Sequence, residues 1–353
     1  MKLSALIITY NQEKSVAAAV ESALMQTVDF DFEVVVAEDH STDGTREVVQ
    51  ELERRHPEKV RAICRDKNLG ANANFIEALS VCRGEYVATL EGDDLWTHPR
   101  KLQRQADFLD AHPECSMCCH AVNYVHEDGS QPPHRVPEGE YKQLSNLQEM
   151  LTSVGCHTCS YMFRRLLLSS PPDWLRTLWI GDWPIRMLLA EQGYMGYIDE
   201  VMAEYRIHPG GVWSGTSSEK QLEGSLQMFR CVRRHLSDRC SAETAWLVAC
   251  SACRLSRLRE LAGKRDEARS LLIEAIGLLL EETPGDQNLI DELIRIVARL
   301  AAETSSKASL DFVQLRAKSE ELARLKASRF WRMRQFLVST PGLGPLLRAL
   351  RRR

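Results

Sequence analysis

The chain has 353 residues, of which 44% are hydrophobic and 27% charged, so it is long enough for two domains and has an ordinary globular composition. No apolar run reaches the roughly 18 residues of a membrane span, so we expect no transmembrane helix. The formal net charge of −4 argues against a nucleic-acid-binding body, and we expect no nucleic acid among the partners.

The amino-terminal stretch MKLSALIITYNQ has too short an apolar core for a signal peptide, so we expect a first strand there and a cytoplasmic location. The 11 scattered cysteines are then expected to be reduced thiols. Three pairs have CxxC spacing, which is compatible with zinc or redox chemistry. They lack flanking turn glycines and a matched second pair, so small buried residues are the favoured interpretation of Cys115/Cys118, Cys156/Cys159 and Cys250/Cys253.

Strand and helix signals alternate along the first part of the chain. Apolar runs predict strands at 3–10, 32–39, 60–66 and 85–91, and helical periodicity predicts helices at 13–26, 45–56 and 71–82. This alternation predicts an α/β fold with a mostly parallel sheet and helices on its faces. Ligands of such sheets bind beyond the carboxyl ends of the strands. Polar residues gather at those ends, namely Thr9, Tyr10, Asn11, Glu38, Asp39, Glu91, Asp93 and Asp94.

The fourth strand ends in three acids within four positions, Glu91, Asp93 and Asp94. Carboxylates this close repel one another and raise each other's pKa. A divalent cation is the expected compensation, because hard oxygen ligands suit Mg²⁺ and Mn²⁺. The alternative is an acidic turn that caps the next helix, which is predicted from Lys101 onward.

The middle of the chain is less regular. A stretch with broken periodicity follows residue 113 and contains the Pro/Gly-rich loop EDGSQPPHRVPEGEY. Order returns with a strand, a loop, a helix opened by Asp182 and a strand that ends near Arg206. The glycines of YRIHPGGVWSG then mark a mobile loop.

From residue 219 to about residue 328 the sequence reads as helix throughout, and the segment RLRELAGKRDEARSLLIEAI is similar to one tetratricopeptide helix pair with its turn at Gly263. The last segment, 329–353, is basic, apolar and aromatic. It is expected either to attach to an anionic surface at the inner face of the membrane or to pack on the protein body. We therefore expect three parts, at 1–218, 219–328 and 329–353.

Six segments, in this order, resemble the landmarks of the family 2 glycosyltransferases, which have the GT-A fold: IITYNQ, AEDHSTDGT, DKNLGANANF, LEGDDLWTHPRKLQRQ, GDWPIRMLLAEQG and YRIHPGGVWSG. The resemblance covers approximately residues 1–218. It implies a Rossmann-like domain that transfers a sugar, with inversion, from a UDP- or dTDP-linked donor to an acceptor hydroxyl. The acceptor would be a glycan, a lipid-linked molecule or a protein.

The resemblance also implies site roles. The nucleotide would contact Thr9, Tyr10 and Asn11, with the Tyr10 ring on the base and Glu38 or Asp39 accepting a hydrogen bond from it. EGDD resembles the family's DxD element with Glu91 in first place. Asp93 would then bind Mn²⁺ or Mg²⁺, His208 would be a further ligand, and Glu91 and Asp94 would contact ribose, metal or water. Arg65 or Lys67 would meet a phosphate, unless both are ordinary solvated basic residues. Thr158 and Ser160 are weaker candidates to line the pocket.

Asp182 lies between two tryptophans in WIGDWPIRM, where burial would raise its pKa and suit a general base. The resemblance implies that it takes the proton of the acceptor hydroxyl. A plain helix-capping role is the alternative and is compatible with catalysis. At the level of the whole chain, a catalytically silent nucleotide-sugar-binding or scaffold protein, whose helical half mediates interactions, is the alternative to an enzyme.

Overall fold

The computed structural model describes residues 1–139, 141–152, 156–236 and 240–282. The chain divides after Thr216 into two compact units, and each is described by itself. The second part of the predicted helical region and the predicted basic tail, residues 283–353, lie outside the described residues.

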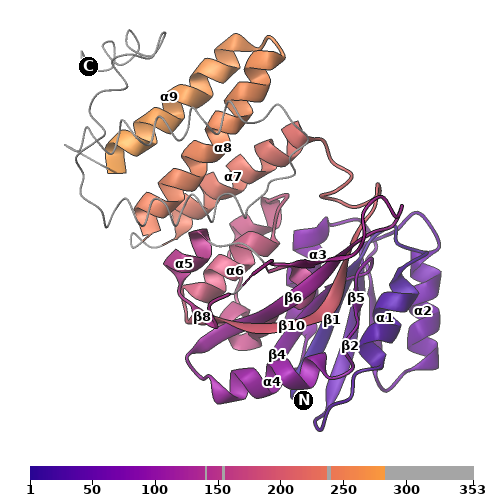
Figure 1. Cartoon of the computed structure of the whole chain (residues 1–353). Helices are drawn as coiled ribbons and strands as arrows, with labels where there is room; N and C mark the ends of the chain where they lie inside the picture. The colour runs from indigo at the N-terminus through magenta and orange to yellow at the C-terminus, as the bar shows by residue number, and fades with distance from the viewer. Residues whose placement is uncertain (140, 153–155, 237–239, 283–353) are drawn as a thin grey trace. The chain divides into compact units, whose positions relative to one another are not determined.

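The first unit begins with the predicted alternation of strands and helices (Figure 1). Its first two strands are buried on both faces, as apolar runs in a covered parallel sheet should be. In chain order the elements are β1 (Leu3–Thr9), α1 (Val16–Leu24), β2 (Phe32–Glu38), α2 (Thr45–Arg55), β3 (Val60–Cys64), α3 (Ala71–Val81), β4 (Tyr86–Glu91), β5 (Leu95–Trp96) and α4 (Lys101–Ala111).

The remainder of the first unit contains one long strand that the sequence pattern did not predict, β6 (Cys115–His126). Its buried half includes cysteines, a serine and His120, so neither an apolar run nor an alternating pattern marks it. The other elements are β7 (His134–Val136), β8 (Leu144–Ser145), α5 (Leu147–Thr152), β9 (Met162–Arg164), α6 (Asp182–Ala190), β10 (Tyr194–Ile207) and three 3₁₀ turns, η1 (Thr158–Ser160), η2 (Arg165–Leu168) and η3 (Asp173–Thr177).

The strands form one mixed sheet in the order β3-β2-β1-β4-β9-β6-β10-β5, with β7 beside β6 and β8 beside β10. The first four strands of this order are parallel where they pair, and β6 and β10 are parallel to each other. β9 runs antiparallel to both β4 and β6 and joins the two parallel parts. The predicted α/β architecture with a mostly parallel sheet is confirmed, and a helical region follows it.

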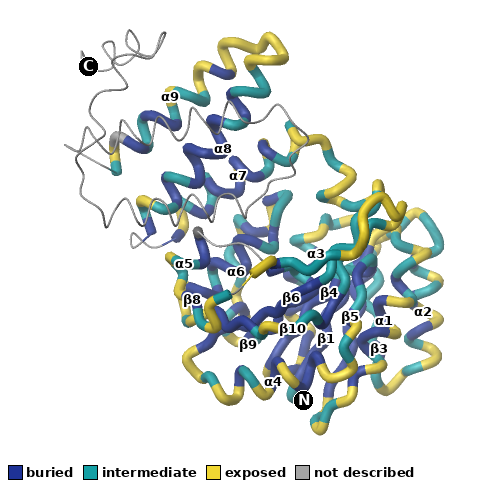
Figure 2. The backbone as a smooth tube through the Cα atoms, in the orientation of Figure 1, coloured by how far each residue is buried: buried dark blue, intermediate teal, exposed yellow. Residues whose placement is uncertain are grey.

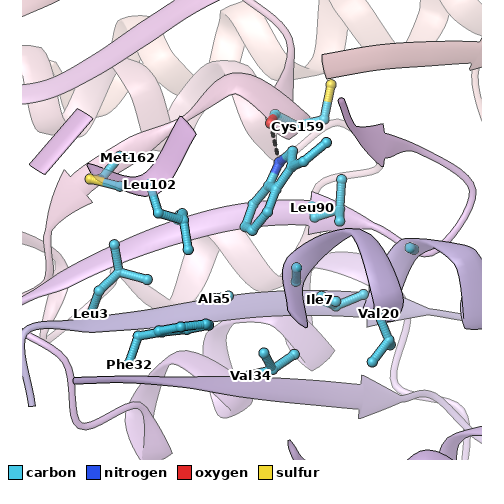
Figure 3. Close-up of a cluster of buried hydrophobic side chains, with 14 of the residues drawn as sticks. Leu3, Ala5, Ile7, Val20, Phe32, Val34, Leu90, Leu102, Cys159 and Met162 are labelled. Atoms are coloured by element: carbon cyan, nitrogen blue, oxygen red, sulfur yellow. Dashed lines mark hydrogen bonds between the residues drawn. The ribbon is translucent and has the colours of Figure 1, made fainter. Parts of the chain in front are cut away.

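Burial explains why this sheet is stable. Alternate residues of the central strands, including Leu3, Ala5 and Ile7 of β1, face one hydrophobic cluster that α1 and α4 also line (Figure 3). The intervening residues, such as Leu6 and Val35, are buried on the opposite face. The tube in Figure 2 is accordingly darkest along the sheet. At approximately 25 cal/mol for each Å² of apolar surface removed from water, such a two-sided core is the main stabilising contribution.

The structure corrects one expectation about the cysteines. Cys119 and Cys156 form a disulfide, with their Cα atoms 6.1 Å apart, so the expectation of reduced thiols throughout is wrong for this pair. The two residues are 37 positions apart, and only the fold brings β6 next to the segment before η1. The free members of the CxxC pairs, Cys115, Cys118, Cys159, Cys250 and Cys253, are all buried. No metal-binding cluster involves them within the described ranges.

The second unit contains α7 (Ser218–His235), α8 (Ser241–Leu261) and α9 (Arg265–Glu282). A tight turn joins α8 to α9, and Gly263 adopts φ +78°, a conformation that favours glycine. Ala268 and Ala275 of α9 are buried, as expected for the small residues of a packed helix pair. Across the part of the chain that the structure describes, no helix combines the length and apolarity needed to cross a membrane.

Candidate active site

The carboxyl ends of β1, β2 and β4 meet at one edge of the sheet. Thr9 lies opposite Glu38, and Ile8 lies opposite Glu91, in the register of the parallel pairs. The next residue after β4 is Gly92, where an added Cβ would lie 2.7 Å from the Thr9 hydroxyl oxygen. Only glycine lets the turn after β4 approach β1 this closely, and this turn carries the acids.

Strand pairing also brings the end of β10 to this edge. β5 pairs with β10 antiparallel, so that Leu95 lies opposite Glu204. The His208 side chain then reaches the acidic turn, and its Nε2 atom lies 3.0 Å from Oδ2 of Asp93. This hydrogen bond raises the pKa of His208. The two residues predicted to share a cation are therefore in contact, although they are 115 positions apart in the sequence.

The other two acids of this turn, Glu91 and Asp94, have carboxylate oxygens without hydrogen-bond partners among the described residues. Asp94 is 2% exposed, and its Oδ1 accepts a hydrogen bond of 2.8 Å from the backbone N–H of Arg206. Oδ2 of Asp94 and Oε2 of Glu91 are buried without a hydrogen-bond partner among the described residues. Burial, reinforced by the charge of Asp93, raises the pKa of Glu91 to about 8. Burial and the charges of Glu91 and Asp93 raise the pKa of Asp94 well above its usual range.

The contact between Asp93 and His208 and the unpartnered carboxylate oxygens beside it fit a bound cation. Within the described residues no three His, Cys, Asp or Glu side chains converge as a complete cage for a metal ion. A Mg²⁺ or Mn²⁺ ion that also binds phosphate oxygens needs only one or two protein ligands, however, and Asp93 and His208 could supply them. Orphaned carboxylate oxygens beside that pair are the observation that favours an added positive charge.

Asp182 is the first residue of α6, and the helix is capped by Gly181 without a side-chain hydrogen bond. Asp182 is therefore not the N-cap residue of this helix. Burial raises the pKa of the Asp182 carboxyl, as expected from its surroundings, and the positive charge of Arg186 partly offsets the effect. The charge of Asp182 in turn contributes to the raised pKa of Glu91.

The loop after β1 forms an exposed turn next to the edge of the sheet. Asn11 adopts φ +54°, and its Oδ1 accepts a 2.8 Å hydrogen bond from the backbone N–H of Thr42. Thr9 is buried and donates to Gln12 Oε1 at 2.8 Å, whereas Tyr10 is 45% exposed. An exposed ring next to a fixed polar loop is compatible with the predicted stacking on a base, which stays a prediction.

Three other predicted nucleotide contacts already have protein partners. Both Asp39 oxygens accept backbone N–H groups, from Leu69 and Gly70, each at 2.8 Å. Glu38 is fully buried, accepts from the backbone N–H of Ser41 and pairs with Arg46 at 2.7 Å.

Arg65 donates to Oδ1 of Asn74 at 2.9 Å and lies 3.3 Å from Glu77. It is therefore neither the solvated arginine of the alternative nor a free cation. The side chains of Glu38, Asp39 and Arg65 thus support the loops around the site, and their contacts with a nucleotide stay predictions.

Two groups of aromatic side chains lie on segments that adjoin site residues in the sequence. Trp179, three residues before Asp182, stacks on Trp213 of the loop that follows His208, with ring centres 5.7 Å apart and planes at 23°. His157, next to Thr158, lies between Tyr124 and Tyr205, with ring centres 5.0 and 4.9 Å away. The weaker candidate Thr158 donates a side-chain hydrogen bond that lowers the pKa of Glu91.

Sequence reasoning missed two features of this site, the ring cluster around His157 and the buried guanidinium of Arg186. The ring cluster joins three distant segments, so no local pattern could have marked it. Arg186 had a usable signal, because it follows Asp182 by four positions on a predicted helix, where the two side chains share a face.

Comparison with known proteins agrees with the family resemblance of the sequence motifs. Residues 4–169 match the family model described as glycosyl transferase family 2. An uncharacterized protein of Mycobacterium tuberculosis is 36% identical over 219 residues, which are 62% of each chain. The chondroitin synthase of Escherichia coli is 41% identical over 155 residues, 44% of this chain and 21% of the synthase. The chain thus matches less than two thirds of the length of these curated relatives.

Among solved structures, Staphylococcus aureus TarS in complex with UDP has a TM-score of 0.58 to this chain. It is 21% identical and covers 94% of this chain and 93% of the TarS chain. At this identity the likeness concerns the fold alone.

Proposed function

We propose that this chain is a member of glycosyl transferase family 2, whose model matches residues 4–169, and that it transfers a sugar from a nucleotide donor to an acceptor hydroxyl with inversion at the sugar carbon. The observation that carries the proposal is the Asp93–His208 pair beside the orphaned carboxylate oxygens at the sheet edge. Asp182, which is half-buried at the start of α6, acts electrostatically on Glu91 of the same edge.

The donor would bind along the ends of β1, β2 and β4. The base would lie against Tyr10 and the loop of Asn11, and the diphosphate would lie near Asp93. Asp93 and His208 would hold Mn²⁺ or Mg²⁺, which supplies counter-charge to the diphosphate. Without such a charge the acids and the phosphates would repel each other.

Asp182 would act on the acceptor. Its carboxylate accepts the proton of the acceptor hydroxyl while that oxygen forms a bond to the anomeric carbon. The bond between the anomeric carbon and the diphosphate oxygen breaks at the same time, and its electron pair leaves with the nucleoside diphosphate. Attack opposite the leaving group in a single displacement inverts the configuration, and no second protein nucleophile is needed.

We further propose that the donor is UDP- or dTDP-linked and that the product is a cell-surface or polysaccharide glycan. The named activity of the E. coli relative, chondroitin synthase, and the UDP bound in the TarS structure support this choice. The proposed location is cytoplasmic, with residues 329–353 attaching to an anionic membrane. Sedimentation with anionic liposomes, with and without those residues, tests the attachment: salt-insensitive or tail-independent binding would rule it out.

A donor screen tests the proposed activity. We expect the chain with Mn²⁺ or Mg²⁺ to release nucleoside diphosphate from one class of nucleotide sugar, and to do so faster when a suitable acceptor is added. The panel contains UDP-, dTDP- and GDP-linked sugars, and the released diphosphate is measured by a coupled assay. Binding of a nucleotide sugar without any release, across the panel and with added oligosaccharide acceptors, would instead support the silent binding protein.

A further inference from the structure

Arg186 is among the largest fully buried side chains of the chain, with 1% of its surface exposed. Its guanidinium carbon lies 4.4 Å from the centre of the Trp183 ring. Nε and Nη2 have no hydrogen-bond partner among the described residues. A guanidinium keeps its charge at any ordinary pH, and burying it without partners costs stability. The chain therefore retains a cation at a position where it weakens the fold, which indicates a functional role.

The acid nearest to Arg186 along the helix is the proposed base. Asp182 begins α6 and Arg186 follows four residues later, so the two side chains lie on the same helix face. The positive charge favours the ionised form of the acid, because it lowers the pKa of Asp182 against the upward effect of burial. Helix geometry, burial and charge all couple these two residues.

The other groups that face this pair do not supply a competing cation. Glu91 of β4 is an acid whose own pKa is raised in part by Asp182. Burial, together with the charge of Arg186, lowers the pKa of His157 to about 4, so that imidazole is neutral at pH 7. Burial raises the pKa of the Tyr161 phenol beyond the range of ordinary titration, so it is neutral as well.

Further titratable groups of the elements packed against α6 bond elsewhere. Glu149 of α5 pairs with Lys142, and Arg165 of η2 donates to the Gly84 carbonyl. On β6, His120 hydrogen-bonds the Ala121 carbonyl, Tyr124 bonds His157, and His126 bonds Ser130. Among the described residues, Arg186 is therefore the cation whose charge acts on Asp182.

We propose that Arg186 is a positioning residue that holds the Asp182 carboxylate ionised and aimed at the acceptor. This inference rests on the proposed function, in which Asp182 is the base. Arg186 itself contacts neither substrate nor reacting atoms in this account. The ring of Trp183, 4.4 Å from the guanidinium carbon, adds a cation–π contact that helps to hold the cation in place.

The test is the pH dependence of kcat/KM in the full chain with donor and Mn²⁺. Arg186→Met should move the acid limb of the profile upward by about one pH unit or more, since removal of an opposite charge has effects of this size. At a pH on the acid limb, transfer should then fall about tenfold for each unit of the shift and recover at alkaline pH, with the donor KM unchanged. Arg186→Lys, which keeps a positive charge, should restore most of the acid limb. Arg176→Met, at an exposed arginine paired with Glu77, serves as the matched control.

Equal loss of transfer at every pH in Arg186→Met would overturn the proposal and leave a purely structural role. A double variant gives a second criterion, which also applies through the uncharged Arg186→Gln if the methionine variant does not fold. If Arg186 acts through Asp182, then substituting it in an Asp182→Asn background should cause no further loss of kcat. A large additional loss would contradict the inference. If the single variant Asp182→Asn transferred sugar at the rate of the unsubstituted chain, that result would instead contradict the proposed function.

Discussion

Asp93→Ala is expected to abolish divalent-dependent transfer, with a loss on the order of 10² to 10³-fold or more, as is usual when a main electrostatic contact to the developing charge is removed. The variant removes the carboxylate that lies 3.0 Å from His208 and leaves Glu91 and Asp94 without a cation to offset their repulsion. Binding of UDP in Mn²⁺ should weaken together with turnover, because the diphosphate loses its counter-charge. Initial rates and calorimetric UDP titrations measure the two effects.

Asp31→Ala is the matched control for this prediction. Asp31 is an exposed acid directly before β2, at the opposite end of the strand from the site. It should retain both binding and turnover. Metal-dependent transfer by Asp93→Ala at a rate near that of the unsubstituted chain would show that the cation is held elsewhere.

Asp182→Asn should separate chemistry from donor binding. The substitution keeps the shape of the side chain and removes its ability to accept a proton, so transfer should fall by about 10² to 10⁴-fold, the usual contribution of general-base catalysis. Donor affinity should survive, because Asp182 acts on the acceptor. Asp173→Asn, at an exposed acid opening η3, is the control.

The raised pKa of Asp182 also predicts how the rate of transfer depends on pH. Burial raises the pKa of Asp182, and only the ionised carboxylate can act as a base. Transfer by the unsubstituted chain should therefore decline as the pH falls through that raised value, at a higher pH than an exposed aspartate would give. If Asp182→Asn lost donor affinity in parallel with transfer, the role of Asp182 would instead be to maintain the structure of α6.

Local pattern was sufficient to predict the first part of the sheet. β1, β2 and β4 are mostly apolar and are buried on both faces, so their signal does not depend on distant contacts. β6 carries no such signal, because its buried residues are small, sulfur-containing or polar. The Cys119–Cys156 disulfide was missed for a related reason, since it depends on the path of β6.

The acidic edge could be predicted because strand ends converge by rule in a parallel sheet. His208 entered the prediction only through the family resemblance, and its contact with Asp93 depends on the pairing of β5 with β10. Asp39 and Arg65 show the limit of this reasoning. A polar residue at a strand end can bind a ligand or hold a neighbouring loop, and only the structure reveals the loop partners.

The central claim is that this edge of the sheet binds a nucleoside diphosphate through a divalent cation. Calorimetric titration of the full chain with UDP, dTDP and GDP, in Mn²⁺ and then in excess chelator, tests it most directly. The account predicts saturable binding of UDP or dTDP in Mn²⁺ and a loss of affinity of at least about tenfold, or 1.4 kcal/mol, when the metal is removed. Binding that is unchanged by the chelator, or no binding of any of the three nucleotides in Mn²⁺, would contradict it.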